Sequence, residues 1–318
     1  MAGVVMYIST LQNAALSLGA GIFAAIAFFS GTANSQNDGN VLFLSEYLYG
    51  DYYYAPLGDI DRWRPRPIRP KQLRLPSNFR ANVELGNHDV SYSGEYIVFA
   101  ARNKNDYDWD IYMGTLDLEA RRIRKVERII RNTNERDEDP RFSWDGSQIV
   151  YKCGGNICVY PDLNYANPVV KSWCELWAPA FDASGYRITY TKRCDGPLDD
   201  KIWQYDLSTG LESPLPSTGM STDRFSQFLD DGRIVYSHLD GETARSSLWI
   251  FDSGIVLPLH DRSVSDDDPY PDKHDRGHIA FIGWDDDGYD LYMYRQSRND
   301  SVRLSHGLTV YSPVLFRQ

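Results

Sequence analysis

The chain has 318 residues, with 33 Lys and Arg against 44 Asp and Glu, which gives a formal net charge of -11. Hydrophobic residues make up 42%, aromatic residues 14% and charged residues 24%, which excludes a disordered chain, a coiled coil and a collagen-like fibre. A chain this acidic is poorly suited to bind nucleic acid or an anionic membrane surface.

The first 35 residues are expected to direct export and not to belong to the fold. No Lys or Arg occurs before Arg62, and the stretch from Ala14 to Phe29 is almost wholly apolar. This stretch is short for a membrane-spanning helix, which needs about 20 residues. It suits the apolar region of a signal peptide with a cleavage site after Ala33. A cleaved signal peptide and an uncleaved membrane anchor are the two main interpretations, and both export the rest of the chain. A third, that the segment is neither, stays open.

A hairpin pattern repeats along the remainder of the chain. Five times a Gly precedes a short apolar run that ends in an aromatic residue, and a second short run follows. The glycines are Gly94, Gly146, Gly185, Gly232 and Gly277, and the first runs are Ile97–Phe99, Ile149–Tyr151, Ile188–Tyr190, Ile234–Tyr236 and Ile279–Phe281. Runs of this length, rich in β-branched residues and next to turn residues, indicate strands. A period of 39 to 52 residues built from such strands is typical of propeller blades.

The sequence therefore predicts an all-β fold, a six-bladed β-propeller of four-stranded blades, over residues 40–318. Five repeats are complete, and Val314 to Phe316 looks like the innermost strand of a sixth blade. Three strands near the predicted N-terminus of the mature chain, beginning with Val41 to Leu44, would complete that blade. Pairing the two ends of the chain would close the ring and remove exposed sheet edges.

The best copies of the repeat, Asp137 to Tyr151 and Asp108 to Met113, resemble the repeat of the TolB-like six-bladed propellers, also described as WD40-like. The resemblance covers roughly residues 40 to 318 and implies the fold much more specifically than a function. Similar repeats occur in the TolB translocation protein, in the propellers of prolyl-oligopeptidase-type enzymes and in oligogalacturonate lyases. The chain departs from TolB because too few residues precede the first predicted strand to form the additional α/β domain of that protein.

One face of the propeller is expected to carry acidic loops around the channel mouth. Asp137, Asp223 and Asp268 each lie nine residues before a repeat Gly, so we expect them at one position in three blades. Neighbouring loops on that face add further acidic residues: Asp106, Asp108, Asp110, Asp199, Asp200, Asp285, Asp286 and Asp287. Such a rim would attract a cation, such as calcium, or a basic partner. Alternatively, the Asp side chains cap turns by accepting backbone hydrogen bonds.

Two histidines and all four cysteines are placed on the same face. His88 and His238 are expected near the channel mouth, where they are candidates for chemistry or binding, or simply solvated loop residues. The spacing of the cysteines favours the disulfides Cys153–Cys158 and Cys174–Cys194. A zinc site of four thiolates is the alternative.

Sequence motifs for catalysis are missing: the chain has no G-x-S-x-G, no H-E-x-x-H and no phosphate-binding glycine loop. The leading hypothesis is therefore an exported, non-enzymatic and monomeric propeller, periplasmic or secreted, that binds a protein or a glycan through the acidic loop face. It would need no cofactor, apart from a possible channel cation. The alternative is a polysaccharide lyase or hydrolase with its site at the channel mouth.

Overall fold

The computed structural model describes residues 39–45, 51–58, 60–61, 65–80, 83–105, 107–130, 136–161, 168–196, 199–217, 221–259, 265–275, 277–285 and 288–318. All described strands belong to the compact unit Asn37–Gln318. The predicted export segment lies outside the described residues. Among the described residues there is no helix long and apolar enough to cross a membrane.

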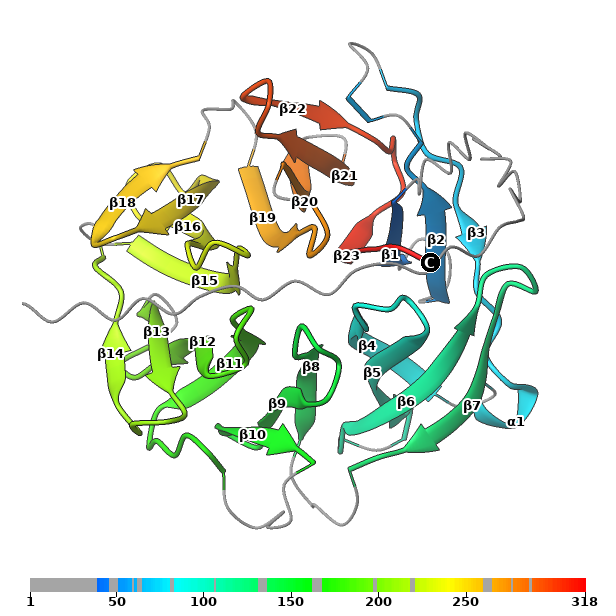
Figure 1. The fold of residues 1–318 in the computed structure, drawn as a ribbon, viewed down its shortest axis with the longest axis horizontal. Coiled ribbons are helices and arrows are strands. Elements are labelled where there is room, and N and C mark those ends of the chain that lie inside the picture. Colours follow the sequence, from blue (N-terminus) through cyan, green and yellow to red (C-terminus); the bar gives the residue numbers. More distant parts are fainter. Residues whose placement is uncertain are drawn as a thin grey trace, which may run out of the picture. The chain divides into compact units, whose positions relative to one another are not determined.

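Six antiparallel sheets form a ring, as predicted, and we number them as blades from the one that contains both chain ends (Figure 1). Blade 1 contains β23 (Val310–Phe316), β1 (Asn40–Ser45), β2 (Asp51–Pro56) and β3 (Lys71–Gln72). Blade 2 contains β4 (Val83–Val90), β5 (Tyr96–Asn103), β6 (Asp110–Asp117) and β7 (Arg122–Arg128), preceded by the short helix α1 (Ser77–Arg80). Blade 3 contains β8 (Asp137–Phe142), β9 (Ile149–Cys153) and β10 (Asn156–Tyr160).

The other three blades each have four strands. Blade 4 contains β11 (Glu175–Phe181), β12 (Arg187–Arg193), β13 (Asp200–Asp206) and β14 (Glu212–Pro214). Blade 5 contains β15 (Ser221–Phe228), β16 (Ile234–Asp240), β17 (Ser246–Asp252) and β18 (Ile255–Pro258). Blade 6 contains β19 (Ser265–Pro271), β20 (His278–Asp285), β21 (Gly288–Arg295) and β22 (Asp300–Arg303). The first strand of each blade, with β23 for blade 1, lies nearest the centre of the ring (Figure 1).

The ring closes as the sequence predicted. β23 pairs with β1, so that Leu315 lies opposite Val41 and Val314 opposite Leu42. Val41, Leu42 and Val314 are fully buried, since their side chains pack into the core shared with neighbouring blades. The last strand of the chain and the first described one therefore complete a single blade.

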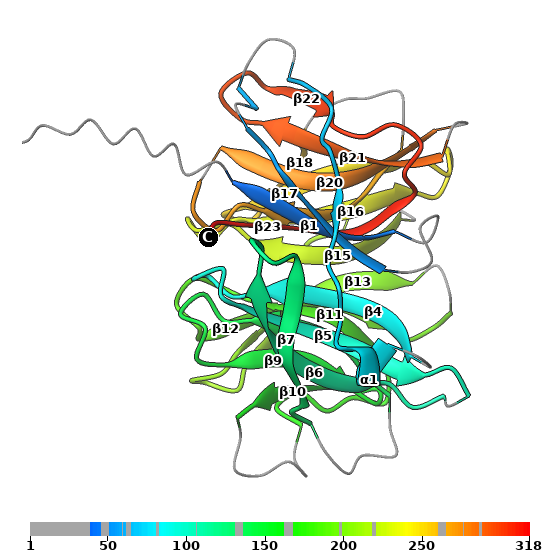
Figure 2. The same ribbon diagram turned by 90° about the vertical axis from the view of Figure 1, so that its right-hand side faces the viewer.

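Because neighbouring strands run in opposite directions, the connections fall on two opposite faces (Figure 2). We call the face with the connections between blades and between second and third strands the loop face. It carries Cys153, Trp173 and Asp240. We call the other face the turn face. It carries the tight turns at Gly94, Gly146, Gly185 and Gly232, all with positive φ, which Gly adopts without steric cost.

Candidate functional site

Two of the predicted site residues meet on blade 5. Asp223 on β15 lies opposite His238 on β16, and Asp223 Oδ1 is 2.7 Å from His238 Nδ1. Both side chains are almost fully buried, and the His238 ring packs at 4.3 Å between centroids against Trp249. The carboxylate and the indole together fix the orientation of the imidazole.

Asp137 and Asp223 do share a position on their inner strands, but Asp268 does not, so this part of the predicted register is wrong. Asp137 lies opposite Cys153 before the bulge in β8, and Asp223 lies opposite His238 before the bulge in β15. In blade 6 the residue before the bulge at the same distance is Asp266. All three of these side chains are buried within the ring of blades instead of standing at an open channel mouth.

The error arises from the length of one turn. In blade 3, Gly146 lies three residues past Ser143, whose backbone N–H closes the turn. In blade 6 the closing residue is Asp272, and Gly277 lies five residues past it. Counting back from Gly277 therefore reaches a different position, and Asp268 falls within the bulge.

Asp268 belongs instead to a series of hydrogen-bonded polar groups around the channel, in which its side chain is hydrogen-bonded to Ser312 and its backbone N–H donates to Ser237 Oγ (3.1 Å). Ser312 Oγ donates to Asn87 Oδ1 (2.7 Å), Asn87 Nδ2 donates to Asp139 Oδ1, and the N–H of Ala178 donates to Asp139 Oδ2 (3.0 Å). These residues occupy the bulge of four neighbouring inner strands. Left-handed φ values, between 47° and 56°, occur at the bulge residues Asp139, Ala178, Phe225, Asp268 and Ser312. The ring of polar groups is thus built from strained bulges, which the blades impose on non-Gly residues.

The Asp268 carboxyl is surrounded by protein on the wall of the channel, although water reaches part of its surface. Burial is the main cause that raises its pKa, to about 7, and the negative charges of Asp267 and Asp139 act in the same direction. The Arg141 guanidinium opposes this rise. At neutral pH Asp268 is therefore balanced between its neutral and charged forms, as the carboxylates of the ring compete for few positive partners.

We expect Asp268 to make the fold less stable as the pH rises through 7. An unfolded Asp has a pKa of about 3.9, so between about pH 4 and pH 7 the folded chain holds a proton that the unfolded chain releases. This extra proton makes the free energy of unfolding fall by at most about 1.4 kcal/mol per pH unit as the pH rises from about 4 to about 7, above which the contribution is gone. In Asp268→Asn it is absent, so the melting temperature of the variant relative to wild type should rise between pH 5 and pH 8. The exposed Asp195→Asn serves as the control, and a constant difference for Asp268→Asn would contradict the assignment.

His88 does not lie at the channel mouth, so that prediction is wrong. It lies within β4, is fully buried, and its ring packs edge-on against Tyr52 at 4.7 Å between centroids. Burial lowers its pKa to about 3, and the nearby Arg141 charge contributes to the lowering. His88 is therefore neutral at physiological pH and serves as a core side chain, because a protonated imidazole would be desolvated there.

A charged cluster fills the channel at its turn-face end. Asp89 on β4 accepts hydrogen bonds from Lys273 Nζ (3.1 Å), from the Tyr270 hydroxyl and from the backbone N–H of Phe142 (2.8 Å). The Arg141 guanidinium lies 5.5 Å from the Tyr270 ring centroid. The cavity left among these residues is about 10 Å³, the space of about one water molecule. The cluster thus links blades 2, 3 and 6 across the centre of the ring.

Both predicted disulfides are present on the loop face. Cys153–Cys158 has a Cα–Cα distance of 5.9 Å and Cys174–Cys194 one of 4.6 Å. All four sulfur atoms are bonded in these pairs, so the alternative zinc site of four thiolates is wrong. Disulfides of this kind are typical of proteins in an oxidising compartment.

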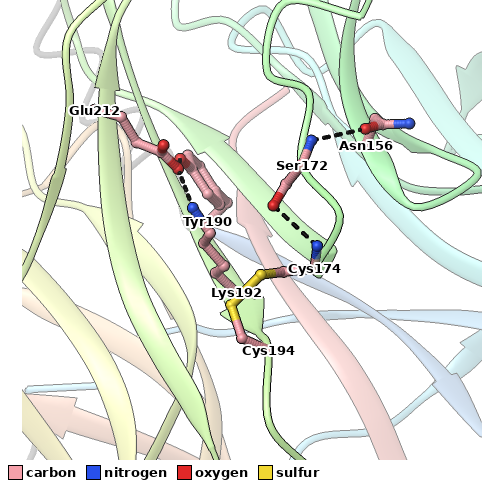
Figure 3. Close-up of a disulfide and its surroundings, with 7 residues drawn as sticks. All are labelled: Asn156, Ser172, Cys174, Tyr190, Lys192, Cys194 and Glu212. Carbon is pink, nitrogen blue, oxygen red and sulfur yellow. Dashed lines mark hydrogen bonds and ion pairs between the residues drawn. A yellow bond between two sulfur atoms is a disulfide. The ribbon is translucent and has the colours of Figure 1, made fainter.

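The second disulfide fixes a connection that presents Trp173. Figure 3 shows Cys174 bonded to Cys194, with the N–H of Cys174 donating to Ser172 Oγ (3.0 Å) and the N–H of Ser172 donating to Asn156 Oδ1 (3.1 Å). Trp173 stands between these anchored residues and is 82% exposed. A large apolar side chain is therefore held in water by a rigid backbone. The residue pattern around Trp173 does not by itself predict an exposed side chain, although its place next to a cysteine is a usable signal for a fixed connection.

Several loop-face carboxylates are paired with basic side chains. Lys152 Nζ is 2.9 Å from Glu175, and Arg193 Nε is 2.6 Å from the buried Asp200. The hydrogen bond from Lys152 lowers the pKa of Glu175. Asp110 pairs with Arg128. Of the other acidic loop residues, Asp106, Asp286 and Asp287 and the side chain of Asp285 lie outside the described residues. An acidic rim therefore stays a prediction.

No group of three or more His, Cys, Asp or Glu side chains that could hold a metal ion occurs in the described part of the chain.

Comparison with known proteins supports the fold. No protein-family model and no curated protein matches the chain. TolB from Acinetobacter baumannii is similar in structure, with a TM-score of 0.64 and 16% identity over 88% of this chain and 67% of TolB. A chain of the nidogen/laminin complex has a TM-score of 0.64 and 9% identity over 87% of this chain and 98% of its own. A putative TolB from Agrobacterium tumefaciens has a TM-score of 0.57 and 13% identity over 88% and 98%. The resemblance to TolB-like six-bladed propellers is thereby confirmed as a resemblance of fold.

Proposed function

We propose that this protein is an exported propeller that binds a protein partner through its loop face. The observation that carries the proposal is Trp173, 82% exposed on a connection held by the Cys174–Cys194 disulfide. Trp is among the residues that most often dominate the free energy of protein binding, because it buries a large area for little loss of side-chain entropy. A backbone fixed before binding lowers the entropic cost further.

The surroundings of Trp173 suit a partner with charged side chains of both signs. Glu175, two residues after Trp173 in the chain, bonds to Lys152 at 2.9 Å and lies 3.7 Å from Arg193, so the connection leads directly into a set of paired acidic and basic groups. A hydrophobic anchor with a charged surround is the usual anatomy of a protein interface. If the loops that contain Asp106, Asp286 and Asp287 add negative charge, basic partner segments would be attracted and association would slow with added salt.

Export is part of the proposal. The two disulfides support it, because such bonds persist in oxidising compartments and are rare in the cytosol. The apolar stretch from Ala14 to Phe29 would direct the chain there. Likeness to TolB and to a chain of the nidogen/laminin complex is consistent with protein binding, although it is a likeness of fold.

Replacing Trp173 by Ala should weaken partner binding at least about 30-fold, which corresponds to the ~2 kcal/mol of an interface hot spot. The partner would be captured from an extract of the exported compartment on immobilised wild-type protein, identified by mass spectrometry, and its affinity measured by calorimetry. Leu211→Ala is the matched control, since Leu211 is 70% exposed and follows the Thr209–Gly210 turn on the turn face. Equal affinities for Trp173→Ala and wild type would refute this site.

The Asp223–His238 pair favours a second candidate function, that of a polysaccharide lyase or hydrolase. With Nδ1 held by Asp223 at 2.7 Å, Nε2 is the nitrogen left for proton transfer. Purified protein would be incubated with neutral and uronate-containing polysaccharides, and released oligosaccharides measured by chromatography. Activity lost in both His238→Ala and Asp223→Asn would support an enzyme. Release that is equal in wild type and both variants would exclude this role for the pair.

A further inference from the structure

Basic residues gather on the outer wall of blades 1 and 2, although the chain as a whole has a net charge of -11. They come from two segments, 65–76, which contains β3, and 117–128, which contains β7 (Figure 1). Together the two segments hold nine basic residues against three acidic ones. We call the basic residues the basic strip: Arg66, Arg69, Lys71, Arg74, Arg121, Arg122, Arg124, Lys125 and Arg128.

Backbone hydrogen bonds join the two segments. The N–H of Arg74 donates to the carbonyl of Arg121 (3.0 Å), and the N–H of Ile123 donates to the carbonyl of Arg74 (3.0 Å). In this parallel bridge Arg74 lies opposite Arg122. Ile123 is buried in the core, whereas Arg74 and Arg122 are exposed, so two guanidinium groups face water side by side. Like charges directly opposite each other destabilise a strand pair, and an anionic ligand bound between them would relieve that repulsion.

Most of the positive charge in the basic strip is not compensated by carboxylates. Two of its arginines are paired, Arg124 with Asp117 (2.6 Å) and Arg128 with Asp110. The other seven basic side chains form no ion pair within the part of the chain that the structure describes. Six of these seven residues are exposed: Arg66, Arg69, Arg74, Arg121, Arg122 and Lys125. The strip is therefore a row of accessible cations, most of them guanidinium groups.

The basic strip lacks the apolar groups that usually accompany charge where a protein or a membrane is bound. None of the large apolar or aromatic side chains that are exposed among the described residues belongs to either segment. Protein interfaces have an apolar core, peripheral membrane binding adds inserted apolar side chains, and single-stranded nucleic acid is held by stacking on aromatic rings. A row of guanidinium groups alone suits a chain of repeated carboxylates, because each guanidinium can bind a carboxylate through two parallel hydrogen bonds.

The shape of the strip and the charge of the rest of the molecule also favour a polymer chain over a flat surface. Segment 65–76 runs along the outer wall of the ring towards α1 (Figure 2). Its eight residues from Arg66 to Arg74 span about 25 Å when extended, which offers room for several sugar residues. An anionic membrane would also approach the acidic remainder of the molecule, whose charges act over about 8 Å at physiological ionic strength. A single polymer chain contacts the strip alone.

We propose that the basic strip binds a linear acidic polysaccharide that carries a carboxylate on most of its sugar residues. One carboxylate lies between the guanidinium groups of Arg74 and Arg122, and others along the same chain pair with Arg66 and Arg69. The strip lies on the outer wall of blades 1 and 2, whereas Trp173 lies on the loop face at blade 4. Polysaccharide binding is therefore a further function, which does not depend on the partner proposed for Trp173.

The probe is an alginate octasaccharide, with uncharged maltooctaose as the control sugar, and affinities are measured by calorimetry. The double variant Arg74→Gln with Arg122→Gln should bind the alginate octasaccharide at least about tenfold more weakly than wild type at low salt, and its affinity should depend less steeply on salt. The matched control, Lys104→Gln with Lys171→Gln, makes the same change in net charge at two exposed loop-face lysines. It should bind as tightly as wild type, and so should Trp173→Ala.

Several results would overturn the proposal. Wild type might bind neither sugar or both equally, or the strip variant might bind alginate as tightly as wild type does. Equal weakening in the lysine control would show that net charge alone accounts for the loss. Tighter binding of anionic phospholipid vesicles or of a single-stranded oligodeoxynucleotide, compared at equal concentration of negative charge, would identify a different class of ligand. Because both substituted arginines are exposed, the strip variant should melt no lower than wild type, and circular dichroism confirms that it is folded.

Discussion

Deleting residues 312–318 should abolish cooperative thermal unfolding or lower the melting temperature by more than about 15 °C. The deletion removes most of β23, including Val314, Leu315 and Phe316, which are at most 2% exposed. Truncating a single buried residue of this size costs about 2 to 5 kcal/mol, so the loss of three approaches the whole stability of a typical domain. The edge of β1 that faces the channel would also be left unpaired, and unpaired edges promote aggregation.

Two controls distinguish ring closure from nonspecific damage. Deleting Arg317 and Gln318 alone keeps β23 and should cost about 1 kcal/mol or less, because Arg317 makes a partly exposed ion pair with Asp272 at 3.4 Å. A peptide covering Leu308 to Gln318, added to the truncated protein, should restore cooperative unfolding by completing blade 1. An unchanged melting curve after the longer deletion would rule out ring closure as a source of stability.

The fold and the disulfides could be predicted because both depend on short-range patterns. Each hairpin repeat is written in consecutive residues, and Cys153 and Cys158 are brought together by their own hairpin. Closure by the chain ends could be predicted because the repeat count left one blade incomplete. Its hydrophobic strands, such as Val41 to Leu44, had no other place in an all-β ring.

The site could be predicted less well because it depends on register within the inner strands. Counting from a turn Gly placed Asp268 beside Asp137, and a turn of different length in blade 6 broke that count. A better signal was present, since the bulged residues Asp139, Ala178, Asp268 and Ser312 each precede a Pro. Pro inside a strand is tolerated mainly at edges and bulges, so this pattern marks the bulge and hence the channel wall.

Contacts across the channel could not be predicted at all. Asp89 and Lys273 are 184 residues apart, and their meeting follows from the curvature of the whole ring, which no local pattern encodes. His88 is a similar case, because its burial against Tyr52 depends on how blades 1 and 2 pack. The exposed position of Trp173 likewise depends on the disulfide and the hydrogen bonds around it. The sequence alone therefore does not show that this side chain is exposed.

Replacing Asp89 by Ala should destabilise the fold by about 3 to 5 kcal/mol, the usual cost of removing one partner from a buried ion pair. Asp89 is fully buried and Lys273 Nζ, 3.1 Å away, belongs to a side chain only 10% exposed. Without the carboxylate, the ammonium group of Lys273 and the Tyr270 hydroxyl would lose their shared acceptor. Chemical denaturation at pH 7 measures the loss. A change below about 1 kcal/mol would show that the cluster does not hold blades 2, 3 and 6 together.

The pH dependence of Asp89→Ala distinguishes an uncompensated charge from a simple cavity. Burial already lowers the pKa of Lys273, and Asp89 opposes that lowering. In the variant the pKa of Lys273 falls further, because the opposing charge of Asp89 is gone. Over a wider pH range the unfolded chain then binds a proton that the folded chain does not. The stability of the variant therefore rises with pH over that range. The loss in free energy of unfolding of Asp89→Ala relative to wild type should therefore shrink between pH 6 and pH 9. The double variant Asp89→Ala with Lys273→Met should recover much of the lost stability at pH 6. A cavity alone would give a deficit that is constant with pH and that the second substitution does not reduce.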